Sequence, residues 1–562
     1  MLIALILIPL AFAALVIAAP ARQARNTALG GTLIALAVGV FAMLPGQFDW
    51  RGAAAAEFQH AQTFSWLPEL GLSFSVGADS VAMMLIALTV LLGPICVVAS
   101  TTAVTERLKT YYAWLLVLQS AMTGVFAARD LIFFYTCFEF TLAPMFVLIS
   151  LYGSTNRRKA AVKFFLYTFT GSIIALAGLV YVAWVNYQNT KVWTFDIATL
   201  QSVGSALPLK AQEWVMLAML AGFAVKVPLF PVHTWLPLAH TEAPTAGSVI
   251  LAGVLLKLGT YAMFRFVLPF TPAAVVEYAP AIGVLSIVGI LYGGLICWVQ
   301  KDVKKLVAYS SVAHLGFCIL GMFALNNTGL TGSVLYMINH GLSTGALFLL
   351  IGMIYERYHT RSMSELGGLA ARMPVWATFM VFFTMASVGL PGLNGFVSEF
   401  LCLLGAFQSS SAWGSSTGMS ESGGLDMGLW GSAGQVVPGA TFGGMGPWFA
   451  AIAGVGMIIA AIYLLYMVGK IVWGPLVEPA HHHHGSHDAN DHGNALPADL
   501  NAREIGTLLP LAALCIFLGV YPKPAMDALQ PPIDNTIEII RRAAPLRAAA
   551  AAPAPQAEEA AR

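Results

Sequence analysis

Residues 221–259 read AGFAVKVPLFPVHTWLPLAHTEAPTAGSVILAGVLLKLG and combine two features that a membrane-spanning helix rarely tolerates. Lys226 lies in the middle of an apolar run, and prolines follow it at positions 228, 231 and 237. Each proline removes a backbone donor and clashes with the preceding turn, so the helix has to break or kink there. A second apolar run begins after Pro244 and carries Lys257 near its centre.

The cost of these features indicates a function for them. A lysine at the centre of a bilayer costs roughly 2.5–3.5 kcal/mol on insertion scales. A broken helix at that depth is tolerated only where it is buried in protein or lines a watery cavity. Both features together predict a pathway for ions or protons. The structural alternative is a lysine that merely bridges free backbone carbonyls at the kink.

The composition places the rest of the chain in a membrane as well. Of the 562 residues, 58% are hydrophobic and 10% are charged, whereas soluble domains carry about 25% charged residues. The formal net charge of +1 gives no reason to expect a nucleic-acid partner. We therefore expect an all-α polytopic membrane protein.

Apolar spans of about 20 residues fit about fourteen positions along the chain, of which the seventh and the twelfth are interrupted. The first is the N-terminus itself, which lacks the basic region of a signal peptide. The others cover residues 27–45, 79–101, 111–128, 130–152, 161–186, 212–236, 245–268, 277–299, 303–325, 330–355, 374–407, 447–474 and 506–522.

Basic residues predict the orientation. One set of alternate loops holds most of the lysines and arginines, whereas the other set holds only Arg51, Arg129, Lys191 and Lys210. Because cytoplasmic loops are enriched in Lys and Arg, the first set is expected in the cytoplasm and both chain ends on the far side.

The two interrupted spans suggest an internal repeat. The seventh breaks at KVPLFP beside Lys226, and the twelfth breaks at residues 389–392 with Glu399 just beyond. Five spans separate them, so the two copies would have opposite orientation, as in transporters built from inverted repeats. The copies would comprise helices 4–8 and helices 9–13.

We expect a division that follows these repeats. Residues 1–110 would form helices 1–3, residues 111–269 the first repeat, and residues 270–475 the second repeat with a Gly/Ser-rich loop at 408–446. Residues 476–505 would form a His-rich loop, and residues 506–562 helix 14 with a disordered tail. The His-rich tract HHHHGSHDANDH, within residues 481–492, is either a solvated loop or a metal-binding segment.

Further charged residues lie within the apolar spans. Glu139 is flanked by long apolar runs, so an unpaired carboxylate would be driven neutral by desolvation, and Lys226 is its natural partner. His314 and His340 also lie in apolar spans, where imidazole can both accept and donate a proton. With Lys257 and Glu399, these residues predict a polar axis through the bilayer. Each histidine alone could instead be a structural residue.

Neither redox nor nucleotide chemistry is indicated on this chain. The sequence contains no GxGxxG or P-loop motif, so no cofactor site is predicted. Its cysteines lie in apolar runs without a CxxC pair, so they indicate neither a disulfide framework nor an iron–sulfur or zinc site. The cysteines are Cys96, Cys137, Cys297, Cys318, Cys402 and Cys515.

Three stretches carry a resemblance to a known family: FEFTLAPMFVLI at 138–149, KVPLFPVHTWLPLAHTEAPTAGSVILAGVLLKLGTYAMFR at 226–265, and VKKLVAYSSVAHLGF at 303–317. They resemble the antiporter-like subunits of respiratory complex I, which are related to subunits of multi-subunit Na⁺/H⁺ antiporters and membrane-bound hydrogenases. Ala262 departs from a glycine that is frequent in the family. In the L- and N-type sisters the twelfth helix usually carries lysine, whereas Glu399 resembles the M-type.

The resemblance implies roles for the intramembrane residues. Glu139 and Lys226 would form a modulating ion pair, Lys257 would be the central bridge, His314 would pass protons onward, and Glu399 would face the exit. His233 and His340 match polar positions on the same axis with less defined roles.

The resemblance also implies the setting. The chain would be a proton-translocating subunit of NADH:quinone oxidoreductase in a bacterial inner membrane, beside L- and N-type subunits. It would bind no cofactor itself, with NADH, FMN, iron–sulfur clusters and quinone in partner subunits. An antiporter or hydrogenase subunit is the nearest alternative, and a scaffold with a relic channel is another.

Overall fold

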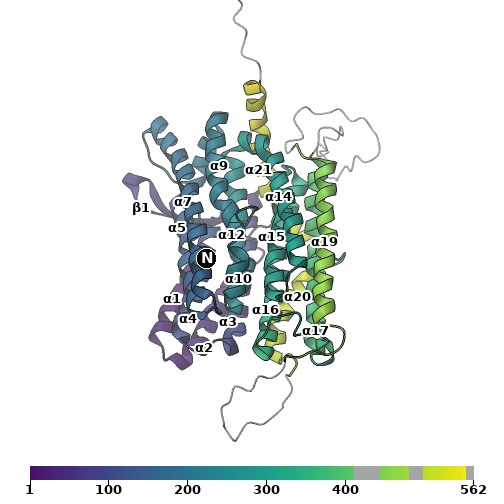
Figure 1. Cartoon of the computed structure of the whole chain (residues 1–562). Coiled ribbons are helices and arrows are strands. Elements are labelled where there is room, and N and C mark those ends of the chain that lie inside the picture. Colours follow the sequence, from purple (N-terminus) through teal and green to yellow (C-terminus); the bar gives the residue numbers. More distant parts are fainter. Residues whose placement is uncertain (410–443, 480–497, 552–562) are drawn as a thin grey trace, which may run out of the picture.

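The computed structural model describes residues 1–409, 444–479 and 498–551, with side chains as far as residue 542. Most of the expected Gly/Ser-rich loop, the His-rich tract and the end of the tail lie outside the described residues. Figure 1 shows most of the described helices standing side by side in one bundle.

The described chain consists mostly of α-helices. In chain order they are α1 (Leu2–Ala18), α2 (Ala24–Ala42), α3 (Ser80–Ala103), α4 (Leu108–Ala127), α5 (Leu131–Phe140), α6 (Leu142–Tyr152), α7 (Arg157–Thr190), α8 (Ile197–Ser205), α9 (Leu209–Lys226), α10 (Leu236–Glu242), α11 (Thr245–Ile250), α12 (Leu256–Ala262), α13 (Leu268–Phe270), α14 (Pro272–Trp298), α15 (Val303–Phe323), α16 (Asn327–Tyr358), α17 (Pro374–Val388), α18 (Asn394–Gln408), α19 (Pro447–Ile471), α20 (Ala502–Val520) and α21 (Lys523–Ala551).

Ten helical segments among the described residues are long and apolar enough to cross a membrane, so the helical, multi-pass class predicted from the sequence is confirmed. They are Ala21–Ala42, Ser80–Ala103, Leu131–Tyr152, Arg157–Thr190, Thr245–Phe270, Pro272–Trp298, Val303–Phe323, Asn327–Tyr358, Pro447–Ile471 and Ala502–Val520. Two shorter apolar helices, Leu2–Ala18 and Pro374–Val388, accompany them.

Three of these segments form the centre of the bundle. Within the most apolar window of each, Thr245–Phe270 is 100% buried, and Val303–Phe323 and Asn327–Tyr358 are each 94% buried. The corresponding window of α7 or α19 is only 39% buried, so those helices lie at the periphery. The central segments carry Lys257, His314 and His340, so the bundle removes these side chains from both lipid and solvent.

Close approach of the central helices depends on glycine. A β-carbon at Gly341 of α16 would lie 2.8 Å from the carbonyl oxygen of Gly253, and one at Gly259 would lie 3.1 Å from the β-carbon of Lys226. The missing side chains therefore let the segment Thr245–Phe270 contact α16 on one side and the end of α9 on the other. This packing brings both intramembrane lysines next to the centre of the bundle.

The central segment is also irregular along its length. Two π-helical turns, η4 (Leu251–Leu255) and η5 (Met263–Val267), flank α12, which carries Lys257. A π-turn leaves carbonyl groups without their usual i+4 partner, and such turns are frequent at functional sites.

Helical structure is interrupted at three places near charged residues. Residues 227–235 separate α9 from α10, residues 389–393 separate α17 from α18, and Thr141 lies between α5 and α6. Prolines account for the first break. At the second, Gly389 and Gly392 have φ angles of 82° and 93°, which favour glycine. Lys226, Glu399 and Glu139 therefore each lie within a turn or two of an interruption.

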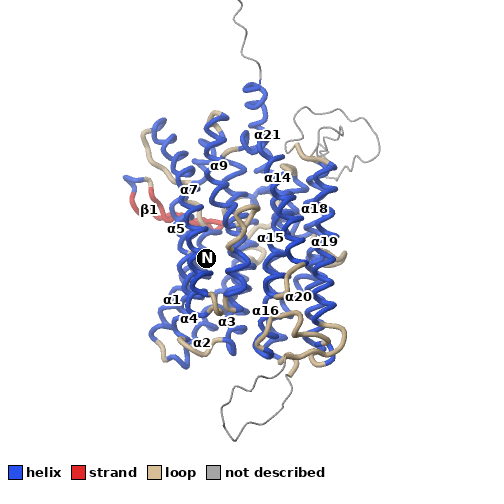
Figure 2. The backbone as a smooth tube through the Cα atoms, in the orientation of Figure 1, coloured by secondary structure: helices blue, strands red, loops and turns tan. Residues whose placement is uncertain are grey.

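A β-hairpin corrects the all-α expectation. Strands β1 (Gln59–Leu67) and β2 (Leu72–Ala78) pair antiparallel, with Thr63 opposite Ser75 and Phe64 opposite Phe74. Figure 2 shows the hairpin in red at one flank of the bundle. Residues of this stretch alternate polar and apolar side chains, a pattern typical of a strand with one covered face.

Helix α21 follows the last predicted span, which ends at residue 522, and no helix was expected there. Its buried residues Leu529, Ile533, Ile537 and Ile540 recur at intervals of a helical turn and pack the helix against α14 and α16. The tandem prolines 531 and 532 lie within this helix, although such a pair usually interrupts one.

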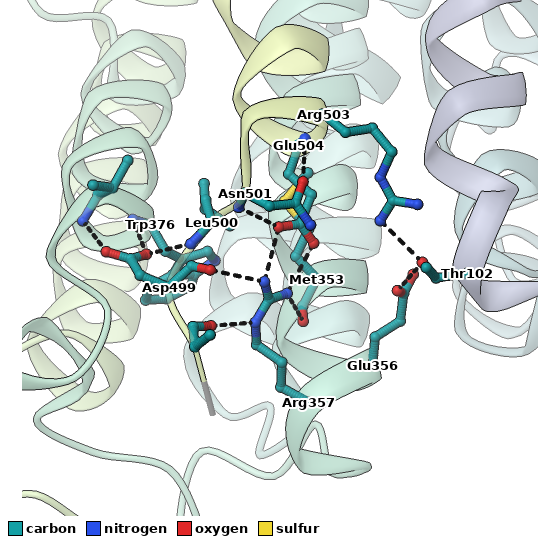
Figure 3. A network of polar contacts seen from close by, with 12 residues as sticks. Thr102, Met353, Glu356, Arg357, Trp376, Asp499, Leu500, Asn501, Arg503 and Glu504 are labelled. Atoms are coloured by element: carbon teal, nitrogen blue, oxygen red, sulfur yellow. Dashed lines mark hydrogen bonds and ion pairs between the residues drawn. The ribbon is translucent and has the colours of Figure 1, made fainter. Parts of the chain in front are cut away.

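A polar network joins four helices at the end of the bundle expected in the cytoplasm (Figure 3). Arg357 of α16 donates two parallel hydrogen bonds to the carboxylate of Glu504 in α20, at 2.9 and 2.8 Å. Asp499 accepts from the backbone amides of residues 375 and 376 and so caps α17. Arg503 donates to Thr102 of α3 at 3.2 Å. Bidentate pairs of this kind fix geometry as well as contributing energy.

Candidate functional site

Most of the intramembrane residues singled out from the sequence are almost completely shielded, whereas Glu139 is half-buried. Exposure is 4% for Lys226, 0% for Lys257, 3% for His314 and His340, and 1% for Glu399. Because burying a charged or polar group without partners is costly, the contacts of each residue decide what it can do.

Lys226 lies at the last position of α9 and reaches the junction of α5 and α6. Its ammonium donates to the carbonyl oxygen of Phe138 at 3.4 Å and to the hydroxyl of Thr141 at 3.2 Å, and it lies 4.1 Å above the centre of the Phe138 ring. These partners flank Glu139 on either side in the sequence. The break at Thr141 thus supplies polar atoms that hold the lysine close to the Glu139 backbone.

Glu139 and Lys226 are neighbours, but the structure does not join them directly. Both carboxylate oxygens of Glu139 are buried and lack a hydrogen-bond partner among the described residues. The ammonium of Lys226 is instead shared between a carbonyl, a hydroxyl and an aromatic ring. The two groups could therefore form an ion pair only after a side chain moves.

Lys257 is joined directly to His340. The ammonium nitrogen lies 2.6 Å from Nδ1 of His340 and also donates to the carbonyl oxygen of Ala252, which belongs to the π-turn η4. Since an ammonium group has no lone pair, Nδ1 of His340 accepts this bond when Lys257 is charged. The contact provides a route by which a proton can pass between the two residues.

His314 and Glu399 form a second cluster on the other side of His340. Nδ1 of His314 lies 2.6 Å from the hydroxyl of Tyr336 and 3.3 Å from Oε1 of Glu399. The hydroxyl of Tyr336 donates to the same Oε1 at 2.6 Å. The rings of His314 and His340 have their centres 5.9 Å apart, so the two clusters are adjacent.

A small cavity connects the two clusters. It has a volume of about 10 Å³ and is lined by residues that include His314, His340, Asn339, Ser387 and Glu399. Four of these residues have a buried polar atom that finds no hydrogen-bond partner in the described part of the chain: His340 Nε2, Asn339 Oδ1, Ser387 Oγ and Glu399 Oε2. The volume and the polar lining both suit a single water molecule, which would link His340 to Glu399.

The position of Glu399 depends on the break between α17 and α18. The side-chain amide of Asn339 donates to the carbonyl oxygen of Asn394 at 2.7 Å and to the hydroxyl of Ser398 at 3.1 Å, while Asn394 donates back to the carbonyl of Asn339 at 3.2 Å. This reciprocal pair anchors the start of α18 on α16. Glu399 follows one turn later and faces His314.

His233 lies apart from these clusters. Its ring is 5.5 Å from that of Tyr292 and 5.8 Å from that of Phe230, and its Nδ1 has no hydrogen-bond partner among the described residues. His240, on α10, is 0% exposed and stacks on Phe348 with ring centres 4.6 Å apart. Within the described residues, neither histidine is hydrogen-bonded to Lys226 or Lys257.

Sequence reasoning missed Tyr336 and Tyr463. Tyr336 lies four residues before His340 on α16, so a helical wheel would have placed both on one face. Tyr463 belongs to α19, and its hydroxyl lies 3.5 Å from Nε2 of His314. No signal in the sequence brings α19 to His314, because that contact depends on how the helices pack.

No group of three or more His, Cys, Asp or Glu side chains that could hold a metal ion occurs within residues 1–409, 444–479 and 498–551. The six cysteines are all free thiols, and five of them are buried. The His-rich tract, for which a metal-binding function was left open, lies outside these ranges.

Comparison with known proteins gives a consistent family. Residues 128–423 match the family model described as NADH:quinone oxidoreductase/Mrp antiporter, TM. The chain is 38% identical to NADH-quinone oxidoreductase subunit M of Rhodobacter capsulatus over 92% of this chain and 91% of that protein. It is 35% identical to NADH-ubiquinone oxidoreductase chain 4 of Marchantia polymorpha over 95% of this chain and 96% of that protein.

Solved structures agree with this relationship. A chain of respiratory complex I from Thermus thermophilus superposes with a TM-score of 0.78 at 28% identity, covering 96% of this chain and 100% of that one. A chain of the Mrp complex from Dietzia sp. DQ12-45-1b superposes with a TM-score of 0.76 at 21% identity, covering 97% and 99%. At 21% identity the second likeness concerns the fold alone.

Proposed function

The chain belongs to the family of NADH:quinone oxidoreductase and Mrp antiporter transmembrane subunits, and from this premise we propose that it is the M-type, proton-translocating subunit of a bacterial NADH:quinone oxidoreductase. The observation that carries the proposal is the buried polar series from Lys257 through His340 and His314 to Glu399, placed in the three most buried segments and the broken helix α17–α18. At roughly 2.5–3.5 kcal/mol for each charge near the bilayer centre, so many titratable groups are better explained by transport than by structure.

Proton transfer would proceed along this series. Lys257 exchanges a proton with His340 across their direct contact, and the polar cavity carries it to the cluster of His314 and Glu399. Glu399 then releases the proton toward the far side. Glu139 and Lys226 act at the uptake end. Formation of their ion pair would change the electrostatic potential at Lys257, because α9 and α12 are in contact.

The proposed architecture has about fourteen passes in two inverted repeats, helices 4–8 and 9–13. The interruption after Lys226 corresponds to that before Glu399, and each lies beside a titratable side chain. Both chain ends would lie on the far side of the inner membrane, because basic residues gather at the opposite end. The network of Arg357 and Glu504 would then fasten the cytoplasmic ends of the helices.

Redox chemistry would be supplied by partner subunits. NADH, FMN, iron–sulfur clusters and quinone would be bound outside this chain, and L- and N-type subunits would lie beside it in the membrane arm. Their chemistry releases the free energy that this chain uses to move protons. A subunit of an Mrp-type cation antiporter is the second candidate, because the Mrp chain shares the fold with a TM-score of 0.76.

Purification under native conditions tests the proposal. The chain, carrying a tag at its C-terminus, is isolated from membranes of its own host in mild detergent. We expect it to co-purify with flavin and with iron–sulfur clusters that NADH reduces, at about one flavin for each copy of the chain. Isolation of a complex that lacks both, and that exchanges Na⁺ for protons in liposomes, would contradict the proposal and support the antiporter.

A further inference from the structure

Tyr336 lies between the two titratable groups at the end of the polar series. Its hydroxyl is 2.6 Å from Nδ1 of His314 and 2.6 Å from Oε1 of Glu399, and the residue is 3% exposed. The position of the hydroxyl raises the question of whether it conducts protons or only holds two helices together.

The number of available protons determines how these bonds are arranged. An ionised carboxylate can only accept hydrogen bonds, so the single hydroxyl proton of Tyr336 points to Glu399. Nδ1 of His314 must then carry a proton and donate it to the tyrosine oxygen. The result is a directed chain of two short hydrogen bonds that runs from His314 to Glu399.

The direct contact between His314 and Glu399 is the weaker path. Nδ1 carries one proton and lies 2.6 Å from the tyrosine oxygen but 3.3 Å from Oε1. The longer contact exceeds the usual ~2.7–3.2 Å of an N–H···O hydrogen bond, so Nδ1 directs its proton to the tyrosine oxygen. While Tyr336 is present, transfer from His314 is therefore expected through the hydroxyl.

We infer that Tyr336 is a proton-relay residue that passes a proton from His314 to Glu399, an inference that rests on the proposed function. When His314 is an imidazolium, its Nδ1–H bond breaks and that proton binds the tyrosine oxygen. In the same step the original hydroxyl proton leaves Tyr336 and binds Oε1 of Glu399. One proton leaves the histidine ring, one arrives on the carboxylate, and the tyrosine is unchanged.

A purely structural role can be separated from a relay. Asn339 and Asn394 already join α16 to α18 by reciprocal hydrogen bonds, so the fold has another connection at this point. The Tyr336 ring also packs near both histidines, with ring centres 6.1 and 6.5 Å away. Phenylalanine keeps this ring and removes only the hydroxyl. Glutamine restores hydrogen bonds to both neighbours but does not relay a proton readily.

The experiment uses the whole complex in inverted membrane vesicles, with NADH oxidation and internal acidification recorded together. Tyr336→Phe and Tyr336→Gln are each expected to lower this chain's contribution to the protons pumped per NADH at least about tenfold, a conservative figure for loss of a proton-transfer group. Tyr111→Phe is the matched control, since Tyr111 is 1% exposed and its hydroxyl makes one 2.8 Å bond to Ser100. It is expected to stay within about twofold of the wild type. Glu399→Gln is measured in parallel.

Each outcome bears on the inference. If Tyr336→Phe pumps within twofold of the wild type while Glu399→Gln is impaired, the relay is overturned. Protons would then reach Glu399 through the polar cavity or through its direct contact with His314. Recovery in Tyr336→Gln alone would show that the hydroxyl only positions its neighbours. If Glu399→Gln itself pumps normally, the proposed function fails at its exit. An infrared carboxyl band that is absent in Glu399→Gln and shifted in Tyr336→Phe would support the bond on which the relay depends, even at low assembly yield.

Discussion

Replacing Glu399 by glutamine is expected to abolish most of the proton pumping that this chain contributes, while assembly and NADH oxidation by partner subunits stay close to normal. Glutamine has nearly the same shape and still accepts a hydrogen bond from Tyr336, so the 2.6 Å contact need not be lost. It cannot take up and release a proton, however, and this ability is what the proposed exit requires.

A series of variants at Glu399 distinguishes titration from shape. Alanine should be as impaired as glutamine. Lysine should retain part of the pumping, because it is titratable and of similar reach. Aspartate should be intermediate, since its stem is shorter by about one bond and the carboxylate would lie farther from Tyr336 and His314.

The measurement is acidification of inverted vesicles at matched rates of NADH oxidation. Glu538→Gln is the control, because Glu538 lies on α21 and its side chain is 41% exposed, and it should behave as the wild type. Normal pumping by the glutamine variant would mean that Glu399 is structural and that the exit lies elsewhere.

Lys226→Ala is expected to have the second-largest effect, a strong loss of NADH-driven pumping with assembly largely retained. Lys226 is 4% exposed, and its ammonium is held by one carbonyl, one hydroxyl and one aromatic face, contacts that leave it able to change partners. A lysine needed only for folding would be expected to have its charge neutralised by a fixed carboxylate. Glu139→Gln should act similarly, because it removes the charge with which Lys226 pairs when the groups move.

The helix itself provides the control for Lys226. Lys210 lies in the first turn of the same helix, α9, with its side chain 80% exposed and paired to Glu213 at 3.0 Å. Lys210→Ala should pump at the wild-type rate, since an exposed ion pair of this kind contributes little to stability. Acidification at the wild-type rate by vesicles that carry Lys226→Ala, with normal electron transfer, would remove the lysine from the pathway.

Much of the architecture could be predicted from the sequence because lipid imposes strict requirements. Long apolar runs and uneven loop charges indicate a multi-pass helical protein, and this class is confirmed by the ten candidate spans. Family membership is confirmed as well, because the motifs around Glu139, Lys226 and His314 are long. The intramembrane charged residues could be identified as functional candidates because placing a charge in lipid costs free energy.

Features set by packing could not be predicted. The contact between Lys257 and His340 depends on two helices approaching at Gly253 and Gly341, which are 88 positions apart in the sequence (341 − 253). Nothing in the sequence distinguishes Tyr336 from other buried tyrosines, because its contact with Glu399 depends on how α18 packs. Helix α21 was missed because its apolar stripe is narrow and its two prolines suggest an interruption.

The hydrogen-bond partners of Lys226 were also beyond the sequence. Opposite charges in apolar runs predict an ion pair, and the fold does bring Lys226 to the junction of α5 and α6, where Glu139 lies. The break at Thr141 exposes a carbonyl and a hydroxyl that compete for the ammonium, so the carboxylate of Glu139 is left without a hydrogen-bond partner among the described residues. Whether the pair forms during turnover stays a prediction.

The central claim is that Lys226 and Glu399 act on one proton pathway through this chain, and it is tested most directly by the number of protons moved per NADH in the double variant. The purified complex is reconstituted in liposomes with Lys226→Ala, Glu399→Gln or both changes. Residues that act in one pathway give non-additive losses. We predict that the double variant moves as many protons per NADH as the more impaired single variant. A ratio lowered by the sum of the two single losses would contradict the account, because the residues would then serve separate routes.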